Sequence, residues 1–368
     1  MYVSFFFPYS LTIALVDTFL QIGTPPQHIP VQFDYATVPL VVSSEQCGQR
    51  LDHCYDYCGD QTLARLYCHD LCYPITRQMW NALCTTPFVA SNSSTYTRVE
   101  NRTWTESLQC CRNQFFGWFA QDRVRFEKAD PKFRDDSFEL EFVEGTYMQS
   151  SAFYGEWGLL GLGLRDQSGS VNFVEQLFRA GRVDAPILSF NRGGYALVGA
   201  LNTADCGNWS FLPVATGEQG WTVEVERIVL YGVEFTKQRV SFDGRNPDLV
   251  IPHAVRRGLV EAGVVLDDCH FYRGDLCVRT DVFRRPVELH VGDQTYAFSV
   301  QTEQSDEKCR TDARNRTFCD VWTEPPVQSG RSFATEPWVL NNGAIMDTLC
   351  WAFDYEHQTV GVGQYRLR

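Results

Sequence analysis

Within residues 19–44, the positions from 29 to 33 show a hydrophobic period of two, the pattern of a strand with one buried face. Ile29, Val31 and Phe33 alternate with polar residues or proline. Residues 23–26 (GTPP) have the composition of a tight turn, because proline presets φ and glycine relaxes the limits on the backbone. The pattern predicts a strand, a turn and a second strand, followed by a further apolar run.

One carboxylate interrupts this apolar stretch. Asp34 lies between Phe33 and Tyr35, where the second predicted strand ends. Burying a charge is costly unless the group is paired or hydrogen-bonded. Two interpretations are therefore open at this point: a functional carboxylate, or an aspartate that shapes a β-turn.

Residues 172–180 show a different period. Apolar residues recur there at the spacing of a helix, and Gly181 follows as a stop signal. The apolar positions are Phe173, Val174, Leu177 and Phe178. The pattern predicts a short amphipathic helix.

The composition is that of a globular chain, with 368 residues of which 44% are hydrophobic and 21% charged. A formal net charge of −13 argues against nucleic acid or an anionic membrane surface as a partner. Fourteen cysteines and four Asn-x-Ser/Thr sequons indicate an oxidising compartment, so we expect a secreted or secretory-pathway or lysosomal-lumen glycoprotein with disulfide bonds. The sequons begin at Asn92, Asn101, Asn208 and Asn315.

The N-terminal residues 1–16 are apolar and allow two interpretations. They are apolar enough for the core of a signal peptide but lack its basic start, and part of them also fits a first strand. The stretch is short for a membrane span, which needs about 20 apolar residues. No other segment is apolar enough, so we expect no integral membrane segment.

Residues 45–84 form a cysteine-rich insert. Cysteines four residues apart lie one helical turn apart, which favours a short helical hairpin closed by disulfides. His53 and His69 leave zinc as an alternative, but the intervals differ from those of common zinc modules, so we expect no metal. The six cysteines, whose pairing stays open, are Cys47, Cys54, Cys58, Cys68, Cys72 and Cys84.

Several motifs of the first half resemble the pepsin-like aspartic proteases. The segment IGTPPQ at residues 22–27 precedes a strand that ends in Phe-Asp, and SSTY at residues 93–96 resembles the segment before the family's flap. Residues 156–163 (EWGLLGLG) resemble the strand beneath the first catalytic aspartate.

The second half carries further motifs of this family, in the same order. They include GGYALVG at residues 193–199 and WVL at residues 338–340, and only residues 45–84 and about 310–335 lack a counterpart. The resemblance implies an all-β, bilobal fold with two β-rich lobes around a central cleft. It places the lobes at residues 1–186 and 187–368.

The same resemblance implies further features of the second lobe and of the assembly. Cys277 and Cys309 bracket a strand pair much as a family disulfide does, so we expect a bond between them. The family is usually monomeric, and we expect a monomer.

The resemblance also implies a catalytic pair, Asp34 and Asp243; the latter lies nine residues before Pro252. In this family two carboxylates share one proton, activate a water and polarise the peptide carbonyl. Each family aspartate is followed by Thr-Gly, whereas this chain has Tyr35-Ala36 and Gly244-Arg245. A tyrosine is too bulky for the threonine position, and a nearby arginine favours ionisation of both carboxylates, which removes the shared proton.

Other family positions near the catalytic pair also differ. Cys110 falls at the flap position, and the flap tyrosine and glycines are absent. Asn341 stands where a supporting glycine is expected, and Asp248 where the family is apolar.

These observations lead to one prediction and two alternatives. We expect a pepsin-like homologue with impaired or no peptidase activity that binds peptides or proteins in its cleft. The first alternative is an active aspartic endopeptidase that uses an Asp34/Asp243 dyad and an activated water. The second is a secreted structural glycoprotein. No nucleophile elbow, P-loop, zinc-protease or dinucleotide motif occurs, so no cofactor is expected.

Overall fold

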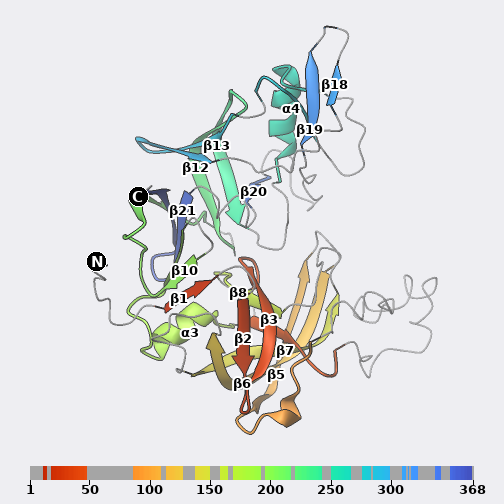
Figure 1. Ribbon diagram of the computed structural model, residues 1–368, viewed down its shortest axis with the longest axis vertical. Coiled ribbons are helices and arrows are strands. Elements are labelled where there is room, and N and C mark those ends of the chain that lie inside the picture. The colour runs from red at the N-terminus through yellow and green to blue at the C-terminus, as the bar shows by residue number, and fades with distance from the viewer. Residues whose placement is uncertain are drawn as a thin grey trace, which may run out of the picture. The chain divides into compact units, whose positions relative to one another are not determined.

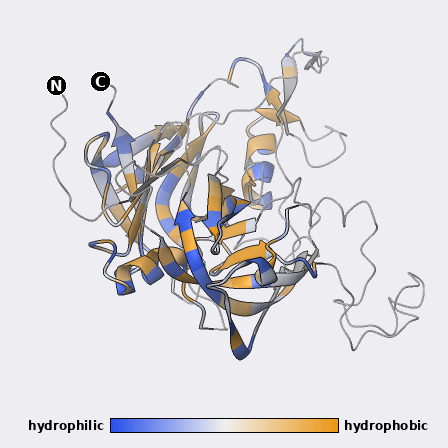
Figure 2. Cartoon of the chain, turned by 60° about the horizontal axis from the view of Figure 1, so that its bottom comes forward, coloured by the Kyte–Doolittle hydropathy of each residue, from blue (hydrophilic) through white to orange (hydrophobic). Residues whose placement is uncertain are grey.

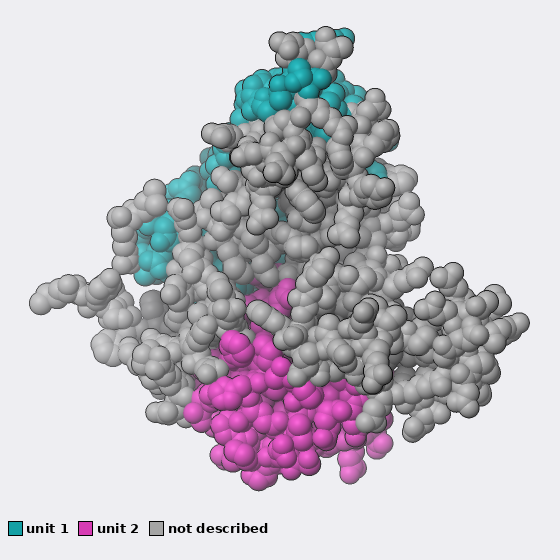
Figure 3. All heavy atoms as spheres, turned by 45° about the vertical axis from the view of Figure 1, so that its right-hand side comes forward, with its two compact units in different colours: residues 1–10, 184–368 teal, residues 11–183 magenta. Residues whose placement is uncertain are grey.

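A computed structural model gives the architecture of the chain in two compact units, which are described separately (Figure 3). The N-terminal unit comprises residues 11–183, and the C-terminal unit contains residues 184–368. The structure describes residues 11–14, 18–47, 86–108, 113–126, 137–149, 158–164, 169–191, 195–216, 220–242, 250–266, 276–282, 285–298, 309–311, 314, 316–321, 336–340 and 349–366.

The N-terminal unit is built mainly from one sheet whose strand order is β2-β3-β8-β4-β7-β6-β5 (Figure 1). Strand β2 also pairs with β6, which curls the sheet back on itself. The elements are β1 (Leu11–Ala14), β2 (Thr18–Ile22), β3 (Gln27–Asp34), β4 (Leu40–Ser43), η3 (Ala90–Asn92), β5 (Thr97–Leu108), β6 (Asn113–Phe126), β7 (Phe138–Gln149), β8 (Gly158–Gly161) and α3 (Phe173–Arg179).

The sequence pattern correctly predicted β2, β3 and the turn between them. The turn occupies residues 23–26, and β2 pairs antiparallel with β3 so that Leu20 lies opposite Ile29. Ile29, Val31 and Phe33 are buried, as the alternation required. Bands of hydrophobic and hydrophilic residues along the strands follow the same rule (Figure 2).

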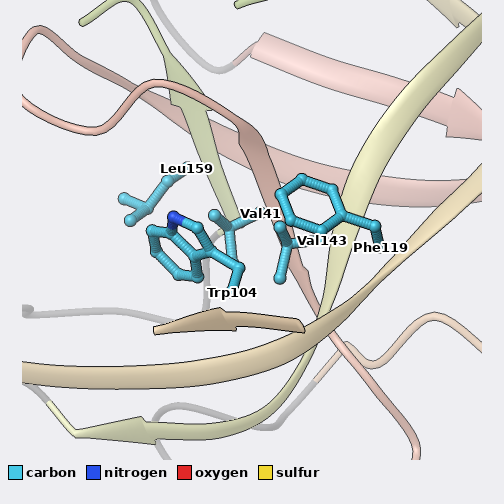
Figure 4. Close-up of a cluster of buried hydrophobic side chains, with 5 residues drawn as sticks. All are labelled: Val41, Trp104, Phe119, Val143 and Leu159. Atoms are coloured by element: carbon cyan, nitrogen blue, oxygen red, sulfur yellow. The ribbon is translucent and has the colours of Figure 1, made fainter. Parts of the chain in front are cut away.

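A cluster of buried side chains from five strands fills the inside of this sheet. Figure 4 shows the Trp104 and Phe119 rings on either side of Val41 and Val143, with Leu159 beside them. Each of these side chains is at most 2% exposed. Burying large apolar side chains is the main source of folding free energy, so this cluster anchors β4 and β8, which flank the candidate site.

The predicted helix is α3, which begins after Asn172 as its N-cap. The Asn172 side chain accepts a hydrogen bond from the backbone N–H of Glu175 at 3.0 Å. The side-chain amide of Gln176 binds the backbone of Glu141 in β7, with bonds of 2.7 and 2.9 Å. Phe178 is 39% exposed, so the apolar face is narrower than the sequence pattern suggested.

The C-terminal unit contains three sheets. The strands that belong to this unit have the orders β10-β9-β21-β22-β11, β17-β16-β12-β13-β20 and β14-β15-β19-β18. The elements are β9 (Ile187–Asn191), β10 (Tyr195–Val198), β11 (Cys206–Pro213), β12 (Thr222–Leu230), β13 (Val233–Phe242), α4 (His253–Glu261), β14 (Val265–Leu266), β15 (Leu276–Arg279), β16 (Val287–Val291), β17 (Gln294–Phe298), β18 (Cys309–Thr311), β19 (Thr317–Val321), β20 (Trp338–Leu340), β21 (Leu349–Asp354) and β22 (Thr359–Tyr365).

The core of the C-terminal unit is aromatic. Phe242 at the end of β13 packs edge-on against Trp351 and Phe353 of β21, with ring centroids 5.0 and 5.3 Å apart. Trp221 lies 5.0 Å from both Phe353 and Tyr355. These contacts join two of the three sheets, because edge-to-face aromatic pairs add to the gain from burial.

A disulfide between Cys206 and Cys350 joins β11 to β21. Both cysteines are fully buried, and 144 residues separate them in sequence. The cysteine content predicts disulfides but not this pair, because spacing alone does not show which strands become neighbours.

The prediction of an all-β fold is confirmed. Strands form nearly all regular structure among the described residues, and α3 and α4 are the only α-helices there. The N-terminal stretch contributes the strand Leu11–Ala14. The cysteine-rich insert lies outside the described residues except for residues 45–47.

Candidate functional site

Asp34 is the last residue of β3, at the point where this strand leaves the sheet. Strand β3 pairs parallel with β8, and Asp34 lies opposite Gly161. The backbone N–H of Leu162 donates to the carbonyl of Asp34 at 2.7 Å. The position of the carboxylate is therefore set by a central sheet pairing rather than by a free loop.

Two glycines let the loop after Asp34 lie directly on β8 and the residues that follow it. A Cβ on Gly161 would lie 2.5 Å from the carbonyl oxygen of Val38, and one on Gly163 would lie 2.7 Å from that of Ala36. Gly163 also donates its N–H to the Thr37 carbonyl at 2.8 Å. Backbone packs on backbone here, which only glycine permits.

The carboxylate of Asp34 has no solvent exposure. Its Oδ1 accepts a hydrogen bond from the backbone N–H of Ala36 at 2.9 Å. An Asp side chain that binds the backbone two residues further on is an Asx-type turn. The turn interpretation of Asp34 therefore describes its local geometry, and it does not conflict with a functional role.

Tyr35 is the most unusual neighbour of Asp34. Its side chain is fully buried. Burial raises the pKa of the Tyr35 hydroxyl, and the negative charge of Asp34 raises it further. The hydroxyl therefore stays protonated in acidic and neutral solution, and the ring occupies more volume than a threonine side chain.

The C-terminal unit contains a second copy of this strand arrangement. Strand β13 ends at Phe242 and pairs parallel with β20, so that Phe242 lies opposite Leu340. On the other side of β20, Val250 pairs antiparallel with Val339 through two backbone hydrogen bonds of 3.1 Å. In the N-terminal unit β8 likewise lies between β3, parallel to it, and β4, antiparallel to it.

The second predicted catalytic residue follows this copy directly in sequence. Asp243 comes immediately after Phe242, as Asp34 comes immediately after Phe33. Residues 243–249 and 341–348 lie outside the described residues, and with them Asp243, Gly244, Arg245, Asp248 and Asn341. Their assigned roles stay predictions.

The predicted flap lies between two long paired strands. Strands β5 and β6 form an antiparallel pair that reaches Leu108 opposite Asn113. Residues 109–112, which connect them, lie outside the described residues and include Cys110. The hairpin is thus present where the resemblance implied a flap, and the role of Cys110 stays a prediction.

The turn before β3, the SSTY segment at residues 93–96 and Asp122 of β6 are joined by hydrogen bonds that hold the fold together. Thr95 donates its hydroxyl to Oδ1 of Asp122 at 2.6 Å, and Ser93 Oγ accepts from the N–H of Thr24 at 3.0 Å. Asp122 is 1% exposed. Gly23 has a φ of +93°, and a Cβ there would lie 2.9 Å from Ser93 Oγ. This network fixes the turn that aligns β2 with β3.

The remaining predicted site residues divide into three groups. Cys277 in β15 is buried and disulfide-bonded, and Cys309 lies in β18 of the same sheet; the bond between them stays a prediction. Asn92, Asn101 and Asn208 are exposed. Asn315 lies outside the described residues.

Neither a metal cluster nor a membrane-spanning helix occurs in the part of the chain that the structure describes. No group of three or more His, Cys, Asp or Glu side chains there is placed to hold a metal ion. Its helices are too short or too polar to cross a bilayer. His53 and His69, which carried the zinc alternative, lie outside the described residues.

The family model for eukaryotic aspartyl proteases matches residues 18–244 of this chain. The match covers more than half of the chain, and it includes both Asp34 and Asp243. The chain therefore belongs to the eukaryotic aspartyl protease family, and the resemblance to pepsin-like proteases is confirmed. No curated protein matches the chain in a sequence search.

Proposed function

We propose that this chain is a pepsin-like aspartic protease homologue with impaired or no peptidase activity, which binds peptides or proteins in the cleft of its fold. The observation that carries the proposal is Tyr35, which is fully buried directly beside Asp34. Proteolysis in this family needs two carboxylates that share one proton across the site. A bulky buried phenol next to one of them opposes that close approach.

The other sequence changes act in the same direction. Ala36 and Arg245 replace the glycines of the two catalytic motifs, and Gly244 removes the second threonine hydroxyl. An arginine close to the pair stabilises both carboxylates in the ionised form, so neither holds the proton that the carbonyl needs. Mutations that disturb a preorganised pair reduce the rate far more than they reduce peptide binding.

The alternative is an active endopeptidase with an Asp34/Asp243 dyad and an activated water. One observation favours it. Asp34 keeps its place at the end of β3, with the Ala36 N–H on its carboxylate and the loop packed on Gly161 and Gly163. This scaffold would position a catalytic carboxylate if the second motif supplied its partner.

A cleavage assay separates the two functions. Purified, disulfide-intact chain is incubated with a denatured protein from acidic to neutral pH, with pepstatin and Asp34→Asn as controls. We expect no cleavage above that of the Asp34→Asn variant. Acid-dependent cleavage that both pepstatin and Asp34→Asn abolish would establish the endopeptidase instead, because a transition-state analogue binds only a competent dyad.

Restoring the family motifs tests the reason for the impairment. The four-residue variant Tyr35→Thr, Ala36→Gly, Gly244→Thr and Arg245→Gly rebuilds both triplets, and we expect it to gain acid cleavage. The matched control carries the same changes with Asp34→Asn and should stay inactive. A restored variant that folds yet cleaves nothing would show that elements beyond the triplets, such as the flap, block the reaction.

Binding is tested separately from cleavage. Fluorescence anisotropy with labelled peptides of varied apolar content should give saturable binding by the wild-type chain. Complete absence of binding would leave the third function, a structural glycoprotein.

We also propose that the chain is a secreted or lumenal glycoprotein. The fourteen cysteines, the buried Cys206–Cys350 disulfide and the exposed sequon residues Asn92, Asn101 and Asn208 support this. Disulfides persist in oxidising compartments, where N-glycans are also attached.

A further inference from the structure

Two of the sequon asparagines have an unusual backbone conformation. Asn101 has a φ of +57° and Asn208 a φ of +51°. Both side chains are exposed. Asn92, also exposed, lies in the short 3-10 helix η3 and is not among the residues with positive φ. The left-handed region is uncommon outside glycine, and asparagine is among the few residues that adopt it readily.

Both asparagines lie at β-bulges. In β5, Arg98 pairs with Ala120 and Thr103 with Trp118, so the residues between Arg98 and Thr103, Asn101 among them, face the single residue Phe119. In β11, the register shifts between Gly207 and Ser210, so that Asn208 and its neighbour face the single residue Gly363. A bulge interrupts the regular ladder and twists the strand locally.

Both bulged strands are also terminal strands of their sheets. Among the strands that the structure describes, β5 is last in the order β2-β3-β8-β4-β7-β6-β5, and β11 is last in β10-β9-β21-β22-β11. The outer edge of such a strand offers backbone groups that can pair with another chain, and natural proteins protect these edges. Each of these two terminal strands thus carries a left-handed sequon asparagine where its register shifts.

We propose that N-glycans on Asn101 and Asn208 cover these two edges and prevent strand pairing between copies of this chain. The inference rests on the proposal that the chain is a glycoprotein, and it assigns the sites and their role. In the attachment step, the Asn Nδ2 bonds to C1 of the first sugar of a lipid-linked diphosphate oligosaccharide. The C1–oxygen bond to the diphosphate breaks, the lipid diphosphate leaves, and Nδ2 loses one proton to the transferase.

The contacts of Asn208 fit a retained glycan. Its Nδ2 donates to Oε1 of Gln364 in β22 at 3.0 Å. A glycosylated amide keeps one N–H, so this hydrogen bond can persist and hold the first sugar beside the strand. The bulge itself is fixed from Tyr296, whose hydroxyl donates to the Asn208 carbonyl and lies 2.7 Å from both that oxygen and Ser210 Oγ.

These contacts decide which variants test the inference. Ser210→Ala would remove the sequon but also a partner of Tyr296, so it would disturb the bulge. Asn→Asp removes the glycan and keeps a residue that tolerates the left-handed conformation. Thr103→Val is a second route at Asn101, because Thr103 is exposed and valine keeps its shape.

The first measurement is occupancy. The chain is secreted from eukaryotic cells, treated with peptide N-glycosidase and sequenced by tandem mass spectrometry, which detects each conversion of Asn to Asp. We expect conversion at Asn101 and Asn208. If neither asparagine is converted, the inference is overturned. Conversion at Asn92 alone would overturn the inference and still support the glycoprotein proposal. Conversion at no sequon would contradict both.

The second measurement is self-association. Asn101→Asp, Asn208→Asp and the double variant are compared with wild type and with the control Asn92→Asp by light scattering over a concentration series. We expect the average molar mass of the double variant to rise with concentration several-fold more steeply than that of the wild type. The single variants should show a smaller rise, and Asn92→Asp should behave as the wild type. Circular dichroism and the thermal midpoint verify folding.

Two outcomes would overturn the role. One is that the double variant and, separately, Thr103→Val both fold and keep the average molar mass of the wild type at every concentration. The other is equal association of the Asn92→Asp control, which would show that any lost glycan promotes association regardless of its place in the sheet.

Discussion

The two copies of the strand arrangement, β3-β8-β4 and β13-β20-Val250, share their pairing and differ in what stabilises it. In the N-terminal copy the loop after Asp34 packs backbone to backbone on Gly161 and Gly163. In the C-terminal copy, of which residues 243–249 and 341–348 are not described, a side-chain hydrogen bond accompanies the backbone pairing. The Nε1–H of Trp338 donates to Oε1 of Gln238 at 3.0 Å. Both copies thus share the backbone pairing, with close glycine contacts described in the first and a tryptophan–glutamine hydrogen bond in the second.

The difference bears on the proposed loss of activity. In sequence, Leu160 is followed by Gly161, whereas Leu340 is followed by Asn341. Asparagine carries the Cβ that position 161 has no room for. We therefore expect the two motifs to depart from the symmetry that a shared-proton pair of aspartates needs.

We expect the largest loss of stability from a substitution of Trp338, in β20 of the C-terminal copy. Trp338 is 1% exposed and packs near Phe235 at a centroid distance of 6.4 Å. Trp338→Ala should lower the free energy of unfolding by about 4 kcal/mol, because it leaves a large cavity. Chemical denaturation followed by circular dichroism measures this loss. Trp338→Phe keeps an aromatic ring and should cost clearly less; an equal loss would mean that the contact with Gln238, not packing, dominates.

The next effect tests the glycine packing of the N-terminal copy. Gly161→Ala places a Cβ against the Val38 and Pro39 carbonyls and should destabilise the chain by about 3 kcal/mol. Gly220→Ala is the matched control, since a Cβ there has no atom within 4 Å, and the midpoint should barely change. If Gly161→Ala were as mild as its control, the contrast between the two copies would fail.

A smaller effect concerns the turn ahead of β3. Thr95→Val removes the hydroxyl that donates to the buried Asp122 at 2.6 Å, so the carboxylate keeps only the Arg123 N–H on that oxygen. We expect a loss of about 2 kcal/mol by chemical denaturation. Thr97→Val, at an exposed position of β5, should be near neutral. If Thr95→Val lowered the free energy of unfolding no more than Thr97→Val does, the turn before β3 would not depend on the hydrogen bond to Asp122.

The smallest effect depends on pH and belongs to the C-terminal unit. A hydrogen bond to Asp354, and then the charge of that carboxylate, raise the pKa of His357 above its usual value. A raised folded-state pKa contributes stability that is complete below the ordinary histidine pKa of about 6.5 and is lost as pH rises through the folded value. NMR titration of the His357 ring should show this shift, and Asp354→Asn should abolish it. An unshifted titration in the wild type would contradict the contact.

Several features of this protein are predicted by its sequence alone. The strands around the GTPP turn, the helix after Asn172 and membership of the aspartic protease family could all be read from it, because period, turn chemistry and motif order are local properties. The sequence also locates Asp34 at the end of a strand, with Tyr35 and Ala36 directly after it.

Only the tertiary structure decided which distant residues meet. It paired Cys206 with Cys350 across 144 residues, buried Tyr35 completely, and gave Gly161 its role against the Val38 carbonyl. It also placed two of the sequons on the bulged edges of sheets. A sequence states which groups are present, but strand order and register arise from packing the whole chain, and these decide which groups become neighbours.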